Sequence, residues 1–228
     1  MASVNQAAYV NGSNSYRFGA GNSIPNIPIT GAPTDTNWER WSMLYDGNDY
    51  RMYFFKGSTN NTIYQFAWDG SSYKYGHNSI PELTLTNIPS DADASSFSGV
   101  CGDGDQYSLY LRQLGNPNLL YQFSWVPGSK SYQWGYGNAI PKITVAGFPT
   151  DTDWSRWSML NDGDYRIYAF KQGSNTEFYQ GAWNGNAYEY GYDSIKVLSL
   201  SDAPANTNFN SVAMLHDGSD YRLYMQTV

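Results

Sequence analysis

The chain repeats one short segment four times, as Asp49-Tyr50-Arg51, Gln106-Tyr107-Ser108, Asp164-Tyr165-Arg166 and Asp220-Tyr221-Arg222. The tyrosines of successive copies lie 57, 58 and 56 residues apart. Self-similarity at a fixed period of this size indicates that one supersecondary unit recurs along the chain. We therefore interpret the 228 residues as four related repeats.

Two further landmarks recur with the same period. One is a Tyr-x-aromatic-Gly segment followed by Ser-Ile or Ala-Ile, with copies at Tyr16–Gly19, Tyr73–Gly76, Tyr132–Gly135 and Tyr188–Gly191. The other is Tyr-Gln-x-x-Trp, with copies at Tyr64–Trp68, Tyr121–Trp125 and Tyr179–Trp183 and a degenerate copy at Asn5–Tyr9. Because the landmarks keep their order, each is expected to hold one fixed place in the repeated unit.

Each repeat is predicted to contain four short strands. In the first full repeat they are residues 41–44, 50–56, 63–68 and a strand from 73 that continues towards 85. Asp-Gly turns separate them, and Asp-Gly is a strong hairpin signal. No segment keeps a 3.6-residue period, so helix should be scarce. The pattern predicts an all-β fold, a four-bladed β-propeller with four antiparallel strands per blade.

The two ends of the chain suggest how the ring closes. The chain begins with landmarks of third and fourth strands and stops after those of first and second strands. We therefore expect one propeller domain over 1–228, with its last blade built by strands from both termini, which removes exposed sheet edges. The expected divisions are blade 1 at about 31–88, blade 2 at about 89–147, blade 3 at about 148–204, and blade 4 split between about 1–30 and 205–228.

Composition restricts the partners. The net charge is -7 and the pI near 4.6, and no Lys/Arg cluster is present, which argues against nucleic acid and anionic membranes. No apolar run approaches the ~18 residues of a membrane helix, so no membrane insertion is expected. Aromatic residues make up 17% of the chain and charged residues only 14%. Such a composition suits half-buried strands and an adhesive surface.

The N-terminus, Met1-Ala2-Ser3-Val4-Asn5-Gln6, lacks the basic and apolar regions of a signal peptide. The single cysteine, Cys101, excludes an internal disulfide framework. Cytoplasmic residence at synthesis is the expectation, and extracellular action through unconventional release stays open.

The passage between blades contains Ser79–Leu83 and then Ile88–Ala94, and the pattern Asp-Tyr-Arg-x-Tyr-x-Phe-Lys-x-Gly occurs in Asp164–Gly173 and, in a shorter form, in Asp49–Gly57. These segments resemble hemopexin-type repeats. The resemblance implies a four-bladed ring. Members of that family bind haem, proteins, polyamines or ions, so it fixes no ligand. The Trp-x-Arg-Trp and Tyr-Gln-x-x-Trp signatures depart from the family pattern.

Blades 1 and 3 share a segment that the other two blades lack. Thr34–Leu44 and Thr150–Leu160 match at nine of eleven positions, and each contains Trp-x-Arg-Trp. The candidate ligand-binding residues are therefore Trp38, Arg40, Trp154 and Arg156. If strands run from axis to rim, these residues gather on the face opposite the Asp-Gly turns. There the tryptophans could stack on sugar and the arginines could bind hydroxyls or an acidic group. The structural alternative is an Arg–Trp stack that holds the passage between blades.

The remaining motifs favour structure over chemistry. Gln65 and Trp68 of the Tyr-Gln-x-x-Trp segment need not share a site, since residues i and i+3 of a strand face opposite sides, and the pair is expected to be structural. The acidic turns, such as Asp46–Asp49, Asp103–Asp105 and Asp162–Asp164, are too short for a dedicated calcium loop. His77 and His216 occupy non-equivalent repeat positions without metal-ligand spacing. No nucleophile or phosphate motif is present, so no catalytic residues and no enzyme are expected.

The function predicted from the sequence is a non-catalytic, lectin-like propeller that binds glycans through sites encoded by the repeats. Several weak copies on one face would add avidity. The alternative is a hemopexin-type module that binds a protein, or a cation, polyamine or haem in the axial channel; acidic net charge favours a cation there. A homo-oligomer is compatible with either hypothesis.

Overall fold

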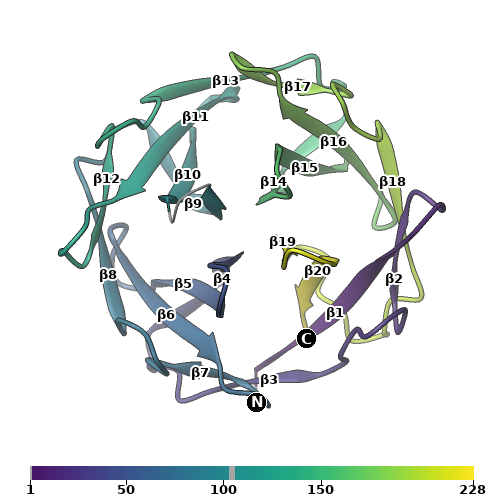
Figure 1. Ribbon diagram of the computed structural model, residues 1–228, viewed down its shortest axis with the longest axis horizontal. Helices are drawn as coiled ribbons and strands as arrows, with labels where there is room; N and C mark the ends of the chain where they lie inside the picture. The colour runs from purple at the N-terminus through teal and green to yellow at the C-terminus, as the bar shows by residue number, and fades with distance from the viewer. Residues whose placement is uncertain (1, 103–105) are drawn as a thin grey trace.

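The computed structural model describes residues 2–102 and 106–228, so the turn at Asp103–Asp105 lies outside the described residues. The described residues form twenty strands and no helix, as expected for an all-β protein. No described segment is a helix long and apolar enough to cross a membrane. All twenty strands belong to one sheet, which curves into a ring (Figure 1).

The strands pair in four groups, which we call units 1 to 4 in chain order. Unit 1 comprises β4 (Thr36–Tyr45), β5 (Tyr50–Lys56), β6 (Thr62–Trp68), β7 (Tyr73–Tyr75) and β8 (Glu82–Thr86). Unit 2 comprises β9 (Ala92–Gly102), β10 (Gln106–Gln113), β11 (Asn116–Trp125), β12 (Ser131–Trp134) and β13 (Lys142–Ala146). Unit 3 comprises β14 (Thr152–Asn161), β15 (Tyr165–Lys171), β16 (Glu177–Trp183), β17 (Ala187–Tyr190) and β18 (Val197–Ser201).

Unit 4 is assembled from both ends of the chain. It comprises β19 (Ala213–His216), β20 (Tyr221–Gln226), β1 (Ser3–Val10), β2 (Ser15–Phe18) and β3 (Ile27–Thr30). β1 pairs antiparallel with β20, with Val4 opposite Gln226 and Ala8 opposite Arg222. Figure 1 shows the two termini close together at the lower edge of the ring. The pairing of the termini thus closes the sheet on itself and leaves no free edge there.

The outermost strand of each unit is broken, which differs from the continuous fourth strand that the sequence predicts. In unit 1, β7 pairs with the end of β6 and β8 pairs with its beginning, so two short strands replace one. The break between β7 and β8 contains Gly76 and Asn78, both with positive φ, and Pro81, which has no N–H to donate. Each half also pairs in parallel with the neighbouring unit, as β3–β7, β8–β12, β13–β17 and β18–β2. The rim of the ring is therefore hydrogen-bonded from unit to unit.

The hydrophobic core consists of four clusters, one at each interface between neighbouring units. Between units 4 and 1, for example, Trp41, Phe54 and Phe66 pack against Ile27 and Tyr224, all fully or almost fully buried. Burial of one such side chain contributes about 1.5–3 kcal/mol. Because every cluster draws on two units, each unit depends on its neighbours for its core.

Serines tie the innermost strands together near the ring axis. The hydroxyl of Ser42 in β4 accepts a hydrogen bond from the Gly99 amide in β9 at 2.7 Å. Ser98 and Ser158 accept equivalent bonds from the next units, at 2.8 and 2.9 Å, from Met159 and Met214. The corresponding residue in β19 is Ala213, so the interface between units 4 and 1 lacks this bond.

Candidate functional site

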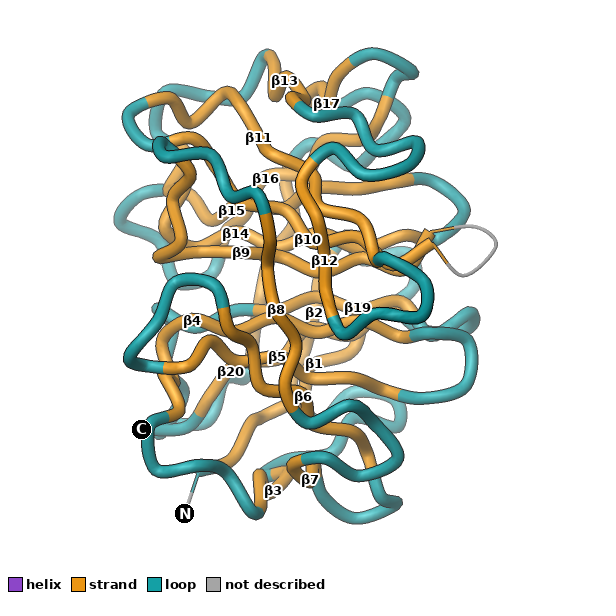
Figure 2. The backbone as a smooth tube through the Cα atoms, turned by 90° about the vertical axis from the view of Figure 1, so that its left-hand side faces the viewer, coloured by secondary structure: helices purple, strands orange, loops and turns teal. Residues whose placement is uncertain are grey.

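The four predicted ligand-binding residues lie in two bulges at the start of β4 and β14. The pairing of β4 with β5 shifts between Asn37 and Trp41, and that of β14 with β15 shifts between Asp153 and Trp157. The intervening residues are excluded from the strand ladder, as is usual in a bulge. β4 ends at Tyr45, directly before the Asp46-Gly47 turn, so the bulge and this turn lie at opposite ends of the strand. Figure 2 shows the connecting loops gathered at these two faces of the ring.

Arg156 is buried and bonded within its own unit. Its Nε donates to Asp153 at 2.7 Å and its Nη1 to Asn175 at 2.9 Å. Its Nη2 donates to the carbonyls of Lys171 and Ser174, and the guanidinium stands 4.8 Å from the centre of the Phe170 ring. Burial acts to raise the pKa of Asp153, but the bonds from Ser155 and Arg156 outweigh it and lower that pKa. These contacts favour a structural role for Arg156, with the guanidinium on Phe170 and not on a tryptophan as the predicted Arg–Trp stack would require.

Arg40 has the same place in unit 1 with fewer partners. Its guanidinium stands 3.9 Å from the centre of the Phe55 ring, and Nη1 donates to Asn60 at 3.1 Å. Its Nε and Nη2 are buried without a partner. The reason lies three residues earlier, where Asn37 replaces the carboxylate that Asp153 offers to Arg156. An amide nitrogen there cannot accept the Nε–H.

Trp38 and Trp154 are half-buried against neighbouring rings and are not exposed platforms. Trp38 contacts Phe54 and Trp154 contacts Phe148, each with ring centres 5.0 Å apart. The structure thus brings each tryptophan near the arginine of its own bulge, while the two bulges belong to different units. The proposed ligand-binding role of these four residues stays a prediction, and none of them lines the cavities described next.

Among the residues that the structure describes, cavities lie at three of the interfaces between neighbouring units, close to the Asp-Gly turns. They measure about 380 Å³ between units 1 and 2, about 280 Å³ between units 3 and 4, and about 140 Å³ between units 4 and 1. Equivalent repeat positions line all three, including an arginine, a glutamine and several tyrosines. The arginines are Arg51, Arg166 and Arg222, and the glutamines are Gln65, Gln180 and Gln6. We call these cavities the inter-unit pockets.

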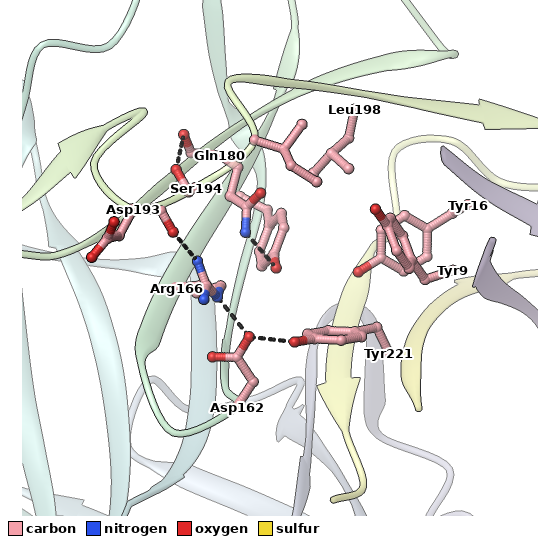
Figure 3. A pocket seen from close by; sticks show the side chains of 11 residues that line it. Tyr9, Tyr16, Asp162, Arg166, Gln180, Asp193, Ser194, Leu198 and Tyr221 are labelled. Atoms are coloured by element: carbon pink, nitrogen blue, oxygen red, sulfur yellow. Dashed lines mark hydrogen bonds and ion pairs between the residues drawn. The ribbon is translucent and has the colours of Figure 1, made fainter. Parts of the chain in front are cut away.

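An arginine and an aspartate form the floor of the pocket between units 3 and 4 (Figure 3). Arg166 Nε donates to Asp162 at 2.6 Å, and the Tyr221 hydroxyl of unit 4 donates to the same carboxylate at 2.7 Å. Arg166 Nη1 donates to the carbonyl of Asp193 at 2.8 Å, and Nη2 reaches Asp164 at 3.4 Å. The guanidinium is thereby held in one orientation beside the cavity.

This network keeps Asp162 ionised. Burial alone raises the pKa of Asp162, but the bonds from Tyr221 and Arg166 outweigh burial and lower it. Burial and the bond to Asp162 raise the pKa of Tyr221 to about 12, so the phenol stays protonated at neutral pH. The pocket therefore presents a fixed set of donors and acceptors across the physiological pH range.

The glutamine comes from the middle of the third strand of each unit. Gln180 Nε2 donates to the Tyr168 hydroxyl at 3.0 Å, while its Oε1 is buried without a partner. The aromatic wall opposite belongs to the next unit and contains Tyr9 and Tyr16, with ring centres 5.4 Å apart. Each pocket is thus polar on the side of one unit and aromatic on the side of the next.

These pockets are not predicted by the sequence patterns, although their residues carry the repeat landmarks. Arg166 belongs to Asp-Tyr-Arg, and Gln180 belongs to Tyr-Gln-x-x-Trp, which we had interpreted as structural. Gln65 lines the pocket between units 1 and 2, whereas Trp68 lines the one between units 4 and 1. The two residues therefore serve different pockets. One sequence signal could have indicated the pockets: the repeat keeps a glutamine in the middle of its third strand, where the neighbouring residues are mostly apolar or aromatic.

The axial region offers little room. A space of about 20 Å³ lies among the four innermost strands, lined by Met43, Met159, Met214 and Gly99, among others. That volume suits a water or a bare ion and is far too small for haem. Within 2–102 and 106–228, no three His, Cys, Asp or Glu side chains gather in a way that could hold a metal. The axial cation stays a prediction.

Comparisons with known proteins retrieve distant structural likenesses only. No family model and no curated protein matches the sequence, so the resemblance to hemopexin-type repeats also stays a prediction. Among solved structures, a six-bladed fucose-recognising propeller lectin from Aleuria aurantia is 17% identical over 96% of this chain, with a TM-score of 0.37. The protein AofleA from Arthrobotrys oligospora is 13% identical over 81% of this chain, with a TM-score of 0.33. A GH43 glycoside hydrolase is 14% identical over 82% of this chain, with a TM-score of 0.41.

The chain spans 62%, 59% and 36% of the lengths of these three proteins. At such similarity, neither their ligands nor their activities transfer to this chain.

Proposed function

We propose that this protein is a non-catalytic, lectin-like propeller that binds carbohydrate in the two larger inter-unit pockets, those of Arg51 and Arg166. The observation that carries the proposal is the arrangement around Arg166. A guanidinium, a buried amide oxygen and a carboxylate stand on one wall, and tyrosines stand on the other. The predicted sugar-binding surface at Trp38 and Trp154 is not needed for this function.

Such a pocket matches the two-sided chemistry of a sugar ring. The C–H faces of a pyranose are apolar and pack on aromatic rings, while its hydroxyls need donors and acceptors in fixed positions. Arg166 and Gln180 supply a donor and an acceptor, and Tyr9 and Tyr16 supply aromatic area. The volumes of about 280 and 380 Å³ suit one sugar residue better than an extended polymer.

Asp162 is poorly suited to act as the general acid of glycoside hydrolysis. A hydrolase needs one carboxyl group that stays protonated near neutral pH to act as general acid. Asp162 is instead held ionised, with a lowered pKa, by Tyr221 and Arg166. We therefore propose binding without turnover.

The same proposal includes a four-bladed propeller. The four units would be its blades, with divisions at about 31–88, 89–147 and 148–204 and the last blade shared by 1–30 and 205–228. The antiparallel pairing within each unit and the pairing of β1 with β20 support this assignment. A ring of four blades would place equivalent pockets on one face.

A glycan array tests the proposal. The labelled wild-type protein should bind at least one family of glycans, and the double variant Arg51→Ser/Arg166→Ser should lose at least ~100-fold in affinity, which is about 2.7 kcal/mol. Serine occupies the equivalent repeat position natively, as Ser108. Because each substitution also leaves a buried aspartate, Asp46 or Asp162, without its cation, circular dichroism checks that the variant is folded, and Gln180→Met, which keeps both ion pairs, is the second variant. Arg17→Ser is the matched control. The Arg17 side chain is 51% exposed, and its ion pair with Asp202 is long, at 3.9 Å, so its loss should disturb little. Absence of binding to every glycan by the wild-type protein would overturn the proposal.

A further inference from the structure

The four units differ in the loop that joins the two halves of the broken outermost strand, such as β7 and β8 in unit 1. In units 1 and 3 the loop is short, Gly76–Ile80 and Gly191–Ile195, and in units 4 and 2 it is one residue longer, Gly19–Ile24 and Gly135–Ile140. The loop length decides whether the side-chain oxygen of the pocket glutamine receives a hydrogen bond from the loop. In the long loops, the amides of Ile24 and Ile140 donate to Oε1 of Gln6 and Gln122, both at 2.9 Å.

In the short loops the glutamine oxygen receives no such bond. Gln180 is only 5% exposed, and its Oε1 has no partner although it lines the pocket. Ser79, in the equivalent loop of unit 1, also lines its pocket with a buried and unpartnered hydroxyl. A buried acceptor or donor without a partner is energetically unfavourable. These pockets therefore contain groups that a hydroxylated ligand would satisfy.

The pocket arginines also differ between units 1 and 3, which have the short loop, and the other two units. In units 1 and 3, Nη1 of Arg51 and Arg166 donates to a carbonyl of the short loop, that of Asn78 at 3.0 Å and that of Asp193 at 2.8 Å. In unit 4 the long loop offers no such bond, and Nη1 of Arg222 is buried without a partner. In unit 2 the position is Ser108, whose hydroxyl accepts from Gln122 at 3.1 Å. Units 1 and 3 thus share one arrangement that the other two lack.

The described short-loop pockets are larger than the described long-loop pocket. The two short-loop pockets measure about 380 and 280 Å³, whereas the pocket at the long loop of unit 4 measures about 140 Å³. The extra residue allows the loop to reach the glutamine and fill the space beside it.

Charge restricts the ligand further. Arg51 is paired with Asp46 at 2.8 Å and Asp49 at 2.9 Å. Arg166 is paired with Asp162 at 2.6 Å and Asp164 at 3.4 Å. Each arginine therefore faces two carboxylates, and the local charge is negative. An acidic sugar would be repelled, whereas the hydroxyls of a neutral sugar can donate to the free glutamine oxygen.

Resting on the proposed function, we propose that the protein is bivalent. Only the pockets of Arg51/Gln65 and Arg166/Gln180 bind ligand, and each takes one uncharged sugar residue that donates a hydroxyl to the glutamine Oε1. The two pockets occupy equivalent positions in units 1 and 3, which lie across the ring from each other (Figure 1). They open on the same face, so both can engage one surface that carries closely spaced neutral glycans.

Native mass spectrometry counts the sites directly. The probes are methyl glycosides of neutral hexoses, 6-deoxyhexoses and N-acetylhexosamines, with sialyllactose as the acidic comparison. The expected result is two bound molecules of the best neutral glycoside and none of sialyllactose. Arg51→Ser and Arg166→Ser should each leave one bound molecule, and Gln180→Met should also leave one. Arg222→Ser should still bind two.

The outcomes separate the two levels of the proposal. Three bound molecules, with one lost in Arg222→Ser, would overturn bivalency while supporting carbohydrate binding, and so would four bound molecules. Binding of sialyllactose in preference to neutral glycosides would overturn the ligand class. No binding of any probe, together with an array on which the wild-type protein binds nothing, would overturn both the proposed function and the inference. Arg17→Ser, at an exposed site, should match the wild-type protein throughout.

Discussion

Arg156 and Arg166 are ten residues apart and are both paired with an aspartate, but Arg156 is buried whereas Arg166 is partly exposed, and they differ in what surrounds them. Arg156 donates only to Asp153, Asn175 and two carbonyls of its own unit. Arg166 stands beside a cavity of about 280 Å³ at the border with the next unit. Both arginines recur in other units, but Arg156 holds a bulge in place whereas Arg166 prepares a binding site. The difference depends on whether unsatisfied groups and open space lie beside it.

The largest expected effect comes from removing Arg156. Arg156→Ala removes four hydrogen bonds and leaves Asp153, whose side chain is only 24% exposed, without its cation. We expect a loss of about 3–5 kcal/mol in the free energy of unfolding, as for other broken buried pairs. Urea unfolding followed by tryptophan fluorescence measures it.

The matched control for this variant is Arg17→Ala, which should change the free energy of unfolding by less than about 0.5 kcal/mol, because its ion pair is exposed. A loss of glycan binding in Arg156→Ala at a temperature where the protein remains folded would instead indicate a direct binding role and restore the sequence-based prediction.

A smaller gain in stability is expected from Asn37→Asp. This change gives Arg40 the carboxylate that Arg156 already has, so that Nε finds a partner. Charge-assisted hydrogen bonds contribute about 1.5–3 kcal/mol, and we expect a gain at the lower end because Arg40 is less buried than Arg156. Thermal unfolding checks it, with Asn60→Asp as a second variant that also adds a carboxylate beside Arg40. A variant no more stable than the wild-type protein would show that the Asn37 position cannot reach Arg40.

The smallest effect concerns the interface between units 4 and 1. Ala213→Ser would place a hydroxyl where the other three units have Ser42, Ser98 and Ser158. If Met43 donates to it, the free energy of unfolding should rise by about 0.5–1.5 kcal/mol. Ser158→Ala, which removes the equivalent bond to Met214, should lower it by a similar amount. Equal stability of both variants and the wild-type protein would mean that these bonds contribute nothing.

Much of the fold could be predicted from the sequence, because strand and turn signals repeat with a fixed period. The strand that begins at Tyr50 and the one that ends at Trp68 are as expected. The break of the outermost strand at Gly76–Pro81 was missed although Gly76, Asn78 and Pro81 are strand-breaking residues. The parallel pairing between units, which holds the two halves, leaves no local signal. The pairing of β1 with β20 was expected from the landmarks at the two ends.

The site was harder to predict for a physical reason. Departure from four-fold symmetry drew attention to Trp38 and Arg156. The ring of Trp38 packs on Phe54 and Arg156 pairs with Asp153, each within one unit, and the carbonyl of Trp38 also accepts a hydrogen bond from Gln226 of unit 4. The pockets combine residues that are far apart in the chain, such as Asp162 and Tyr221, which bond across an interface. Spacing within one repeat cannot show such a pairing. A difference of one residue in loop length, which decides whether Gln180 is free, likewise gains meaning only in three dimensions.

The central claim, that ligand binds between units 1 and 2 and between units 3 and 4, is tested most directly by a crystal structure. The crystals would be grown with the best-binding neutral methyl glycoside. We predict one sugar beside Arg51 and Gln65 and another beside Arg166 and Gln180, each with a hydroxyl within hydrogen-bond distance of the glutamine Oε1. Sugar stacked on Trp38 or Trp154, or bound in the pocket of Arg222 while those two pockets stay empty, would contradict the account.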